Sequence, residues 1–139
     1  MKTTLTCRTW LASSALAVAA LALMTAARVS AHHSFAAEFD AAKPVELKGT
    51  VTRLAWTNPH AHIYVDVKDG GTVTGWDFEL GSPNALVRRG WTGHTLKSGD
   101  VITVSGYLAK DGSHLANART VTLSDGRQVF AGSSLDATN

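Results

Sequence analysis

The six histidines of this 139-residue chain include two close pairs that could hold a metal ion. His60 and His62 are separated by one residue, and in a β-strand such residues lie on one face with Cα atoms about 6.5–7 Å apart. Both imidazoles can then converge on a single ion. One His-x-His pair does not complete a site, so further ligands are needed.

The second pair, His32-His33, can supply those ligands if the mature protein begins there. A terminal histidine offers its amine and its imidazole to the same ion, and one more imidazole gives the three-nitrogen, planar set that suits Cu(II). We therefore predict a transition-metal site formed by His32, His33 and His60, with His62 as an auxiliary ligand. Copper is the favoured ion, zinc is the second choice, and nickel is compatible. The alternative is that both pairs are solvated surface residues.

Polar residues near the histidine pair could assist a metal or bind another ligand. Asp77 and Glu79 are expected on the neighbouring strand, where a carboxylate can ligate a metal or fix the tautomer of an imidazole, or can simply be solvated. Together with Tyr64 and Asp66 they are candidate residues of a metal-free ligand face. The remaining histidines, at positions 94 and 114, occur in glycine-rich turns and are predicted to be surface residues.

The N-terminus has the pattern of a secretory signal peptide. Lys2 and Arg8 precede an apolar run at residues 10–27, which is short for a membrane span of about 20 residues. Small residues ending at Ala31 suit signal peptidase, so we predict cleavage after Ala31 and a periplasmic or secreted protein. Cleavage after Ala27 instead would remove the terminal amine from the proposed metal site.

Removal of this leader changes the composition of the chain. Loss of Lys2, Arg8 and Arg28 leaves 10 basic residues against 11 acidic ones, which argues against nucleic acid or an anionic membrane as the main partner. The single cysteine, Cys7, is lost too, which excludes a disulfide, a thiolate metal site and a cysteine nucleophile. We expect no lipid anchor, because Cys7 precedes the apolar run, and no integral membrane segment after cleavage.

The pattern after residue 44 predicts five main strands and a short sixth, separated by turns rich in Gly and Asp. These strands are residues 45–56, 60–68, 72–80, 101–107, 116–123 and 127–130. Gly49 and a change of apolar parity between Val51 and Leu54 indicate a bulge in the first strand. One short helix is expected at residues 84–89, because Ser82 can be its N-cap, Pro83 fits the first turn and Gly90 can end it.

Three strands, a short helix and two strands are the order of an OB-fold. We therefore predict a mostly β protein, an OB-like five-stranded β-barrel with one short helix between strands 3 and 4. Alternation places aliphatic residues such as Ile63 and Val65 inward, and the histidines with Tyr64 and Asp66 outward. Trp76, Phe78 and Leu80 are expected to point inward as well.

The expected organisation has four parts: a signal peptide at 1–31, an N-terminal arm at 32–44, the barrel domain at 45–131 and a flexible tail at 132–139. The Ala-rich arm could be extended or form one short helix. Enzymatic signatures such as a nucleophile elbow, a phosphate loop or a His-Glu-x-x-His helix are missing, so we lean against an enzyme.

Three functions remain for such a protein. The first is binding of copper or another transition metal. The second is a metal-free binding or accessory module for a periplasmic enzyme, peptide or small molecule. The third is a purely structural accessory subunit, of which an exposed apolar patch would be the sign.

Several segments resemble a family of exported bacterial proteins known only as a domain of unknown function. These segments are HHSFAAEFD (32–40), KPVELKGTVTRLAWTNPHA (43–61), FELGSPNALVRRGW (78–91), LKSGDVITVSGYLAKDGS (96–113) and DGRQVFAGSS (125–134). The resemblance implies that the HHSF start and the TNPHA turn belong to the family pattern. It also implies an aromatic residue at the position of His62, which makes His60 with His32 or His33 the core of the proposed site.

Overall fold

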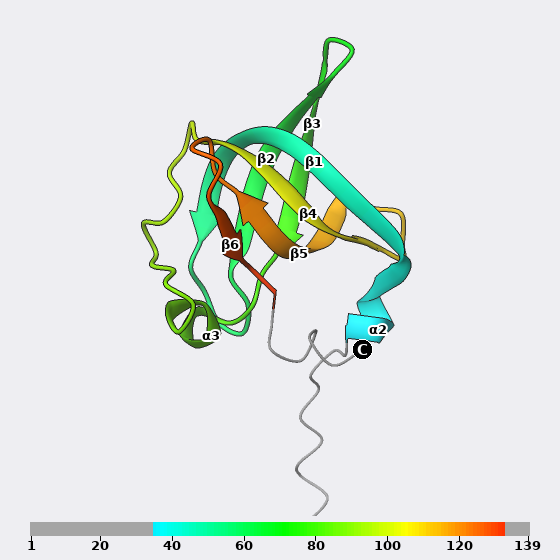
Figure 1. Ribbon diagram of the computed structural model, residues 1–139. Coiled ribbons are helices and arrows are strands. Elements are labelled where there is room, and N and C mark those ends of the chain that lie inside the picture. Colours follow the sequence, from blue (N-terminus) through cyan, green and yellow to red (C-terminus); the bar gives the residue numbers. More distant parts are fainter. Residues whose placement is uncertain (1–34, 133–139) are drawn as a thin grey trace, which may run out of the picture. The chain divides into compact units, whose positions relative to one another are not determined.

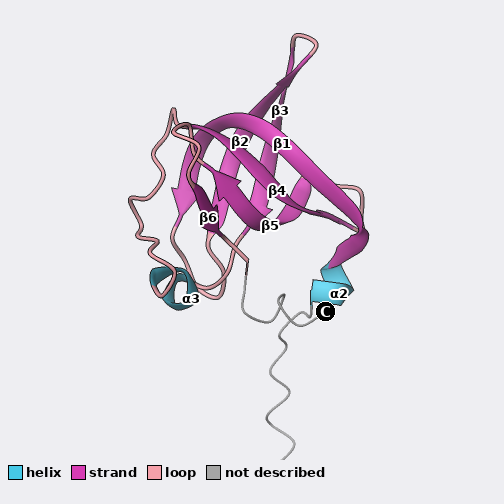
Figure 2. Cartoon of the chain, viewed as in Figure 1, coloured by secondary structure: helices cyan, strands magenta, loops and turns pink. Residues whose placement is uncertain are grey.

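The computed structural model describes residues 35–132, and these residues form a mostly β structure. The chain divides into two units, residues 1–32 and 33–139, and every described residue lies in the second. Six strands join in one sheet, accompanied within the described part by two short helices (Figures 1 and 2). The predicted mostly β class is confirmed.

The elements follow the predicted order. They are α2 (Phe35–Glu38), β1 (Phe39–Ala55), β2 (His62–Asp69), β3 (Thr72–Glu79), α3 (Pro83–Val87), β4 (Val101–Ala109), β5 (Leu115–Thr122) and β6 (Gln128–Phe130). The main difference from the prediction is the start of β1, which begins at Phe39 instead of residue 45. Residues 39–44 lack apolar alternation, but Phe39 and Pro44 pair with β4, so tertiary pairing decides their conformation.

The sheet closes into a ring through its third and fifth strands. The strand order is β3-β2-β1-β4-β5-β6, and β3 also pairs with β5 in parallel at Asp77–Leu115, Phe78–Ala116 and Glu79–Asn117. All other pairings are antiparallel. The first residues of β5 pair with β3, and its last residues pair with β6. The short β6 therefore extends the sheet without opening the ring.

A bulge lets the long strand β1 serve two neighbours. Its register with β2 shifts between Val51 and Arg53, which confirms the predicted irregularity. The backbone of β2 approaches Gly49 closely, because a Cβ there would be 2.5 Å from the carbonyl oxygen of Asp66. The first half of β1 pairs with β4 and the second half with β2, as ring closure requires.

The interior of the ring is filled by the residues that alternation predicted. Ile63, Val65, Phe78 and Leu80 are buried in one cluster with residues of β4 and β5. Trp91 is also buried, and its Nε1 donates a hydrogen bond to the carbonyl oxygen of Phe130 at 2.9 Å. Trp56 and Trp76 pack against the same cluster at its margin.

The helix α3 starts as predicted and ends earlier. Ser82 is its N-cap, Pro83 is in its first turn, and its last residue is Val87 rather than residue 89. Gly90 follows with φ +85, the conformation expected after a helix end. Arg89 donates a hydrogen bond to the carbonyl oxygen of Gly132 and lies 4.3 Å from the centre of the Phe130 ring, so it anchors the chain after β6.

Replacing Ser82 by alanine should lower the free energy of unfolding by about 0.5–1 kcal/mol, the lower half of the usual N-cap range. The effect should be small because Ser82 Oγ accepts from the Ala85 N–H at 3.4 Å. Urea unfolding measures the difference. Ser98→Ala, in an exposed turn, is the control and should change stability by less than about 0.5 kcal/mol.

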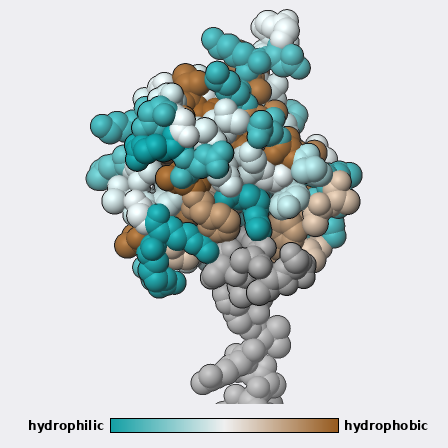
Figure 3. All heavy atoms as spheres, viewed as in Figure 1, coloured by the Kyte–Doolittle hydropathy of each residue, from teal (hydrophilic) through white to brown (hydrophobic). Residues whose placement is uncertain are grey.

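Polar and apolar residues are interspersed on the visible surface. On the face shown in Figure 3, hydrophobic residues form small groups among hydrophilic ones. The large hydrophobic residues exposed in the described part are Val73, Val87 and Val101, one each on β3, α3 and β4. No helix within residues 35–132 is long and apolar enough to cross a membrane.

Candidate functional site

The outward face of β2 and β3 carries the polar residues expected there. The two strands pair antiparallel, with His62 opposite Glu79 and Tyr64 opposite Asp77. Directly opposed residues point to the same side of a sheet. The intervening pair, Ile63 and Phe78, is buried in the ring. Four chemically active side chains are therefore gathered outside the ring on two adjacent strands.

His62 is bound to a carboxylate on the neighbouring strand. Its Nδ1 lies 2.8 Å from Oδ1 of Asp77, and both side chains are about one-third exposed or less. The hydrogen bond to Asp77 raises the pKa of His62, the charges of Asp77, Glu79 and Glu38 raise it further, and partial burial opposes them. The negative charges around the imidazole therefore favour its protonated, cationic form.

His60 makes the corresponding contact one step along the face. Its Nδ1 lies 3.2 Å from Oε1 of Glu79. The ladder between β2 and β3 continues to this point, because the Leu80 N–H donates to the Ala61 carbonyl at 2.8 Å. Thr57 Oγ1 also donates to the carbonyl of His60 at 3.2 Å, just after the cis Asn58–Pro59 peptide. His60 is therefore fixed by the turn that precedes β2.

The two contacts leave the same ring atom available on each histidine. When Nδ1 is engaged by a carboxylate, Nε2 is the nitrogen that can bind a metal ion. Carboxylates in this position orient the imidazole and increase its basicity. Asp77 and Glu79 therefore occupy the positions of orienting partners, one of the two roles predicted for them, and His60 and His62 are the candidate ligands.

The other two candidates on this face lie differently. The ring of Tyr64 is 6.3 Å from that of His62 at 20°, and the guanidinium of Arg53 lies 4.2 Å from the centre of the Tyr64 ring. Tyr64 therefore borders the histidine site. Asp66 is four residues from His62 along the strand, a separation of about 13 Å, and so lies outside it.

Helix α2 adds a residue that sequence reasoning missed. Glu38 is close enough for its charge to raise the pKa of His62. The helix is anchored by Phe35, whose ring meets Tyr107 edge-on at 5.6 Å, and by the Lys110 N–H, which donates to the Glu38 carbonyl at 2.9 Å. Nothing in the Ala-rich segment indicates this position, because it depends on β4.

A second missed residue continues the polar row onto β5. Asn117 pairs with Glu79 on one side and with Tyr107 on the other, so all three point outward. Asn117 is only 4% exposed, and its Oδ1 has no hydrogen-bond partner among the described residues. The sequence pattern did not indicate Asn117 as a site residue, because it lies between two small core residues, Ala116 and Ala118.

The remaining histidines separate into surface residues and residues outside the described part. His94 and His114 are exposed, as predicted. The His114 ring lies 5.1 Å from Trp76, and its carbonyl accepts from the Asp77 N–H at 2.9 Å. His32 and His33 lie outside the described residues. Within residues 35–132, no three His, Cys, Asp or Glu side chains gather closely enough to hold a metal ion.

The family assignment follows from comparison with known sequences. A family of unknown function, DUF6152, matches residues 18–118. The chain belongs to this family. All six histidines fall within the part matched by DUF6152, as do strands β1 to β4. No curated protein matches the chain.

The His62–Asp77 contact predicts a pH-dependent contribution to stability in the metal-free protein. A raised folded-state pKa stabilises the protein fully below the unfolded value of about 6.5, and this contribution is lost as pH rises through the folded value. Asp77→Asn should therefore destabilise the protein at pH 5.5, by about 1 kcal/mol or less, and have a smaller effect at pH 8.5.

Urea unfolding at both pH values, with an NMR titration of the His62 ring, measures this difference. Asp66→Asn on the same face is the matched control and should leave the His62 titration unchanged. An Asp77→Asn effect that is equal at both pH values would contradict the assignment.

Proposed function

We propose that this protein is an exported, OB-like barrel that binds a transition metal, with copper favoured, through His32, His33, His60 and His62. The observation that carries the proposal is the pair of imidazoles whose Nδ1 atoms contact Asp77 and Glu79. The protein would buffer or deliver the ion in the periplasm or outside the cell.

The OB-like assignment is supported by topology. Five strands form a ring in the order β3-β2-β1-β4-β5, and β3 and β5 are parallel where they meet. The helix α3 lies between β3 and β4 in sequence. Proteins of this fold commonly bind ligands on the outward face of strands 2 and 3, where the two histidines lie.

The charge distribution supports a cation as the ligand. Asp77 and Glu79 contact the two rings, and Glu38 lies within electrostatic reach of His62. A metal ion bound through two Nε2 atoms would be attracted by these carboxylates without displacing them. Two imidazoles still leave the coordination incomplete. Further nitrogen donors can complete it without thioether or thiolate ligands.

The mature N-terminus is the proposed source of the remaining donors. His33 precedes Glu38 by five residues, and five residues span at most about 17 Å. Glu38 acts electrostatically on His62, and on this basis we propose that the preceding histidines extend to the two imidazoles. Cleavage after Ala31 would add a terminal amine, and this all-nitrogen set favours Cu(II) over zinc.

A Cu(II) titration of protein processed by its own leader tests the proposal. Intact mass establishes the N-terminus, and electron spin resonance follows binding. We expect one equivalent of Cu(II) to bind, with hyperfine structure from several nitrogens. Weak, substoichiometric binding would overturn the metal function and leave the metal-free module, with Tyr64 and Asp66 on its ligand face, as the alternative.

A matched variant tests the role of the terminal amine. A chain that retains Ala31 ahead of His32 keeps every imidazole but moves the amine away. Loss of affinity in this variant alone would assign the amine as a ligand. Equal affinity would remove the amine from the site and leave a site made of imidazoles.

A further inference from the structure

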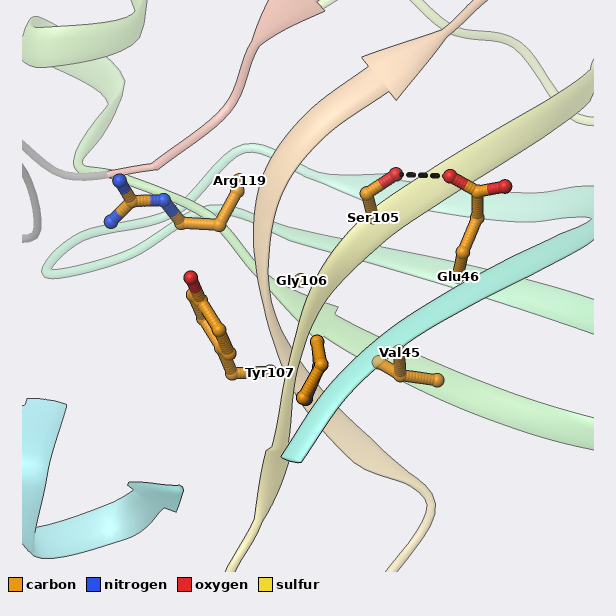
Figure 4. Close-up of a pocket in the computed structure, with 7 residues that line it drawn as sticks. Val45, Glu46, Ser105, Gly106, Tyr107 and Arg119 are labelled. Atoms are coloured by element: carbon orange, nitrogen blue, oxygen red, sulfur yellow. Dashed lines mark hydrogen bonds between the residues drawn. The ribbon is translucent and has the colours of Figure 1, made fainter. Parts of the chain in front are cut away.

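The outer surface of β1, β4 and β5 has a hollow of about 390 Å³ whose charged side chains already have partners (Figure 4). Glu46 Oε2 accepts a hydrogen bond from Ser105 Oγ at 2.8 Å. The Arg119 guanidinium lies 5.6 Å from the centre of the Phe130 ring and 6.0 Å from that of Tyr107. Reactive groups that are less engaged lie instead in the turns between strands.

Three turns contain an aspartate followed directly by glycine, the pair in which aspartate isomerises most readily. The pairs are Asp69-Gly70, Asp111-Gly112 and Asp125-Gly126. In this reaction the backbone nitrogen of the glycine attacks the side-chain carbonyl carbon of the aspartate, and glycine has no side chain to obstruct the approach. The three pairs share one chemistry, so their surroundings in the folded protein decide which of them reacts.

The isomerisation needs no reagent other than water. A bond forms between the glycine nitrogen and the aspartate Cγ, the Cγ–O bond of the protonated carboxyl group breaks, and the hydroxyl leaves with the amide proton as water. Water then opens the five-membered imide at one of its two carbonyls. Opening at the α-carbonyl gives isoaspartate, in which the main chain passes through Cγ, and opening at the other carbonyl restores aspartate.

The carboxylate of Asp111 is held by the residue two positions later. Its Oδ1 accepts hydrogen bonds from the Ser113 N–H at 2.9 Å and from Ser113 Oγ at 2.6 Å. The hydrogen bond from the Ser113 side chain, together with that from its backbone, lowers the pKa of Asp111. A lower pKa leaves less of the protonated acid, which is the form that loses water. Isomerisation of Asp111 is therefore suppressed.

Asp125 is held in the same way, and the attacking nitrogen is engaged as well. Its Oδ2 accepts from Arg127 Nε at 2.7 Å and its Oδ1 from the Arg127 N–H at 3.0 Å, and these bonds lower the pKa of Asp125. The Gly126 N–H donates to the Leu123 carbonyl at 3.0 Å. Imide formation at Asp125 therefore requires the loss of a backbone hydrogen bond in addition.

Asp69 differs from both, although residues 68–70 and 110–112 are the same tripeptide, Lys-Asp-Gly. Asp69 is exposed at the end of β2, directly before the turn formed by Gly70 and Gly71, in the hairpin that projects from the ring (Figure 1). Within residues 35–132 its carboxylate accepts no hydrogen bond and the Gly70 N–H donates none. Because the tripeptides are identical, the folded structure is what distinguishes them.

We propose that, of the three Asp-Gly pairs, Asp69-Gly70 is the one that isomerises to isoaspartate in the folded protein. Isomerisation adds one methylene group to the main chain just before the turn. The Asp69–Thr72 pair, which closes the hairpin, then loses its register, because turn length fixes the register of a hairpin. The exposed product is a substrate for methyltransferases that recognise the isoaspartyl carboxylate.

Incubation of the full-length mature protein at neutral pH tests this proposal. Isoaspartyl methyltransferase with labelled S-adenosylmethionine measures isoaspartate, and peptide mapping assigns the label to a turn. We expect label at Asp69 and little at Asp111 or Asp125. The difference between Asp69 and Asp111 should be lost in urea, because the two tripeptides are the same and only the fold separates them.

Three variants test the chemistry at each turn. Asp69→Glu keeps the charge and should lose the label, because a six-membered imide closes much more slowly. Asp69→Asn should react faster through the same imide, because ammonia leaves more readily than the oxygen of a carboxylate. Ser113→Ala removes a hydrogen bond from Asp111 and should raise the label there. Label at Asp69 that is equal to or below that at Asp111, or no label at all, would overturn the proposal.

Discussion

Replacing His60 by alanine is expected to lower the affinity for Cu(II) by about 100-fold or more. Loss of a residue that only orients a metal ligand typically costs 10–100-fold, and loss of the ligand itself should cost at least as much. His60 is held both by Glu79 and by the turn before β2, so its imidazole is oriented before a metal arrives. Titration with a competing chelator measures the change.

Three further variants make this result specific. His94→Ala, in an exposed turn, should leave the affinity unchanged. His62→Ala should cost less than His60→Ala, because the proposal gives His62 only an auxiliary role. Glu79→Gln should lower affinity by about 10–100-fold while leaving both imidazoles in place. Equal affinities of the His60→Ala and His94→Ala proteins would exclude His60 as a ligand.

Replacing Phe78 by alanine should lower the free energy of unfolding by about 3–5 kcal/mol, the usual cost of emptying a buried aromatic site. Phe78 is fully buried, stacks on Trp76 at 6.0 Å and is opposite Ala116 where β3 meets β5. Its removal therefore empties the core and weakens the closure of the ring. Urea unfolding followed by tryptophan fluorescence measures the loss.

Val73→Ala provides the control on the same strand. Val73 is 52% exposed near the tip of the hairpin formed by β2 and β3, so its truncation should cost less than about 1 kcal/mol. Similar losses for the two variants would mean that the inward and outward faces of β3 are wrongly assigned.

The sequence was most informative where neighbouring strands are joined by short turns. Alternation along residues 60–68 and 72–80, with a glycine turn between, placed Ile63 and Phe78 inside the ring. The start of β1 was missed because Phe39 gains its partner only from β4, which is distant in sequence. The local sequence pattern cannot predict a strand whose extended conformation depends on such a pairing.

The same distinction applies to the candidate site. His60, His62, Asp77 and Glu79 belong to one hairpin, so their proximity follows from strand period and register alone. Glu38 reaches the site through contacts of α2 with β4, and Asn117 through the closing pair of strands. Positions that depend on long-range closure cannot be found from the spacing of residues along the chain.

The closure between β3 and β5 also bears on how the protein folds. Strands β1 to β3 are consecutive antiparallel neighbours, so they can pair early at low cost in loop entropy. The parallel pairs at Asp77–Glu79 and Leu115–Asn117 form only when a much longer stretch of chain, including α3 and β4, has been ordered. Because such non-local contacts slow folding, we expect this seam and the still more distant pairing of β1 with β4 to limit the folding rate together. Glu79 gains its neighbour on β5, Asn117, only when this seam has closed.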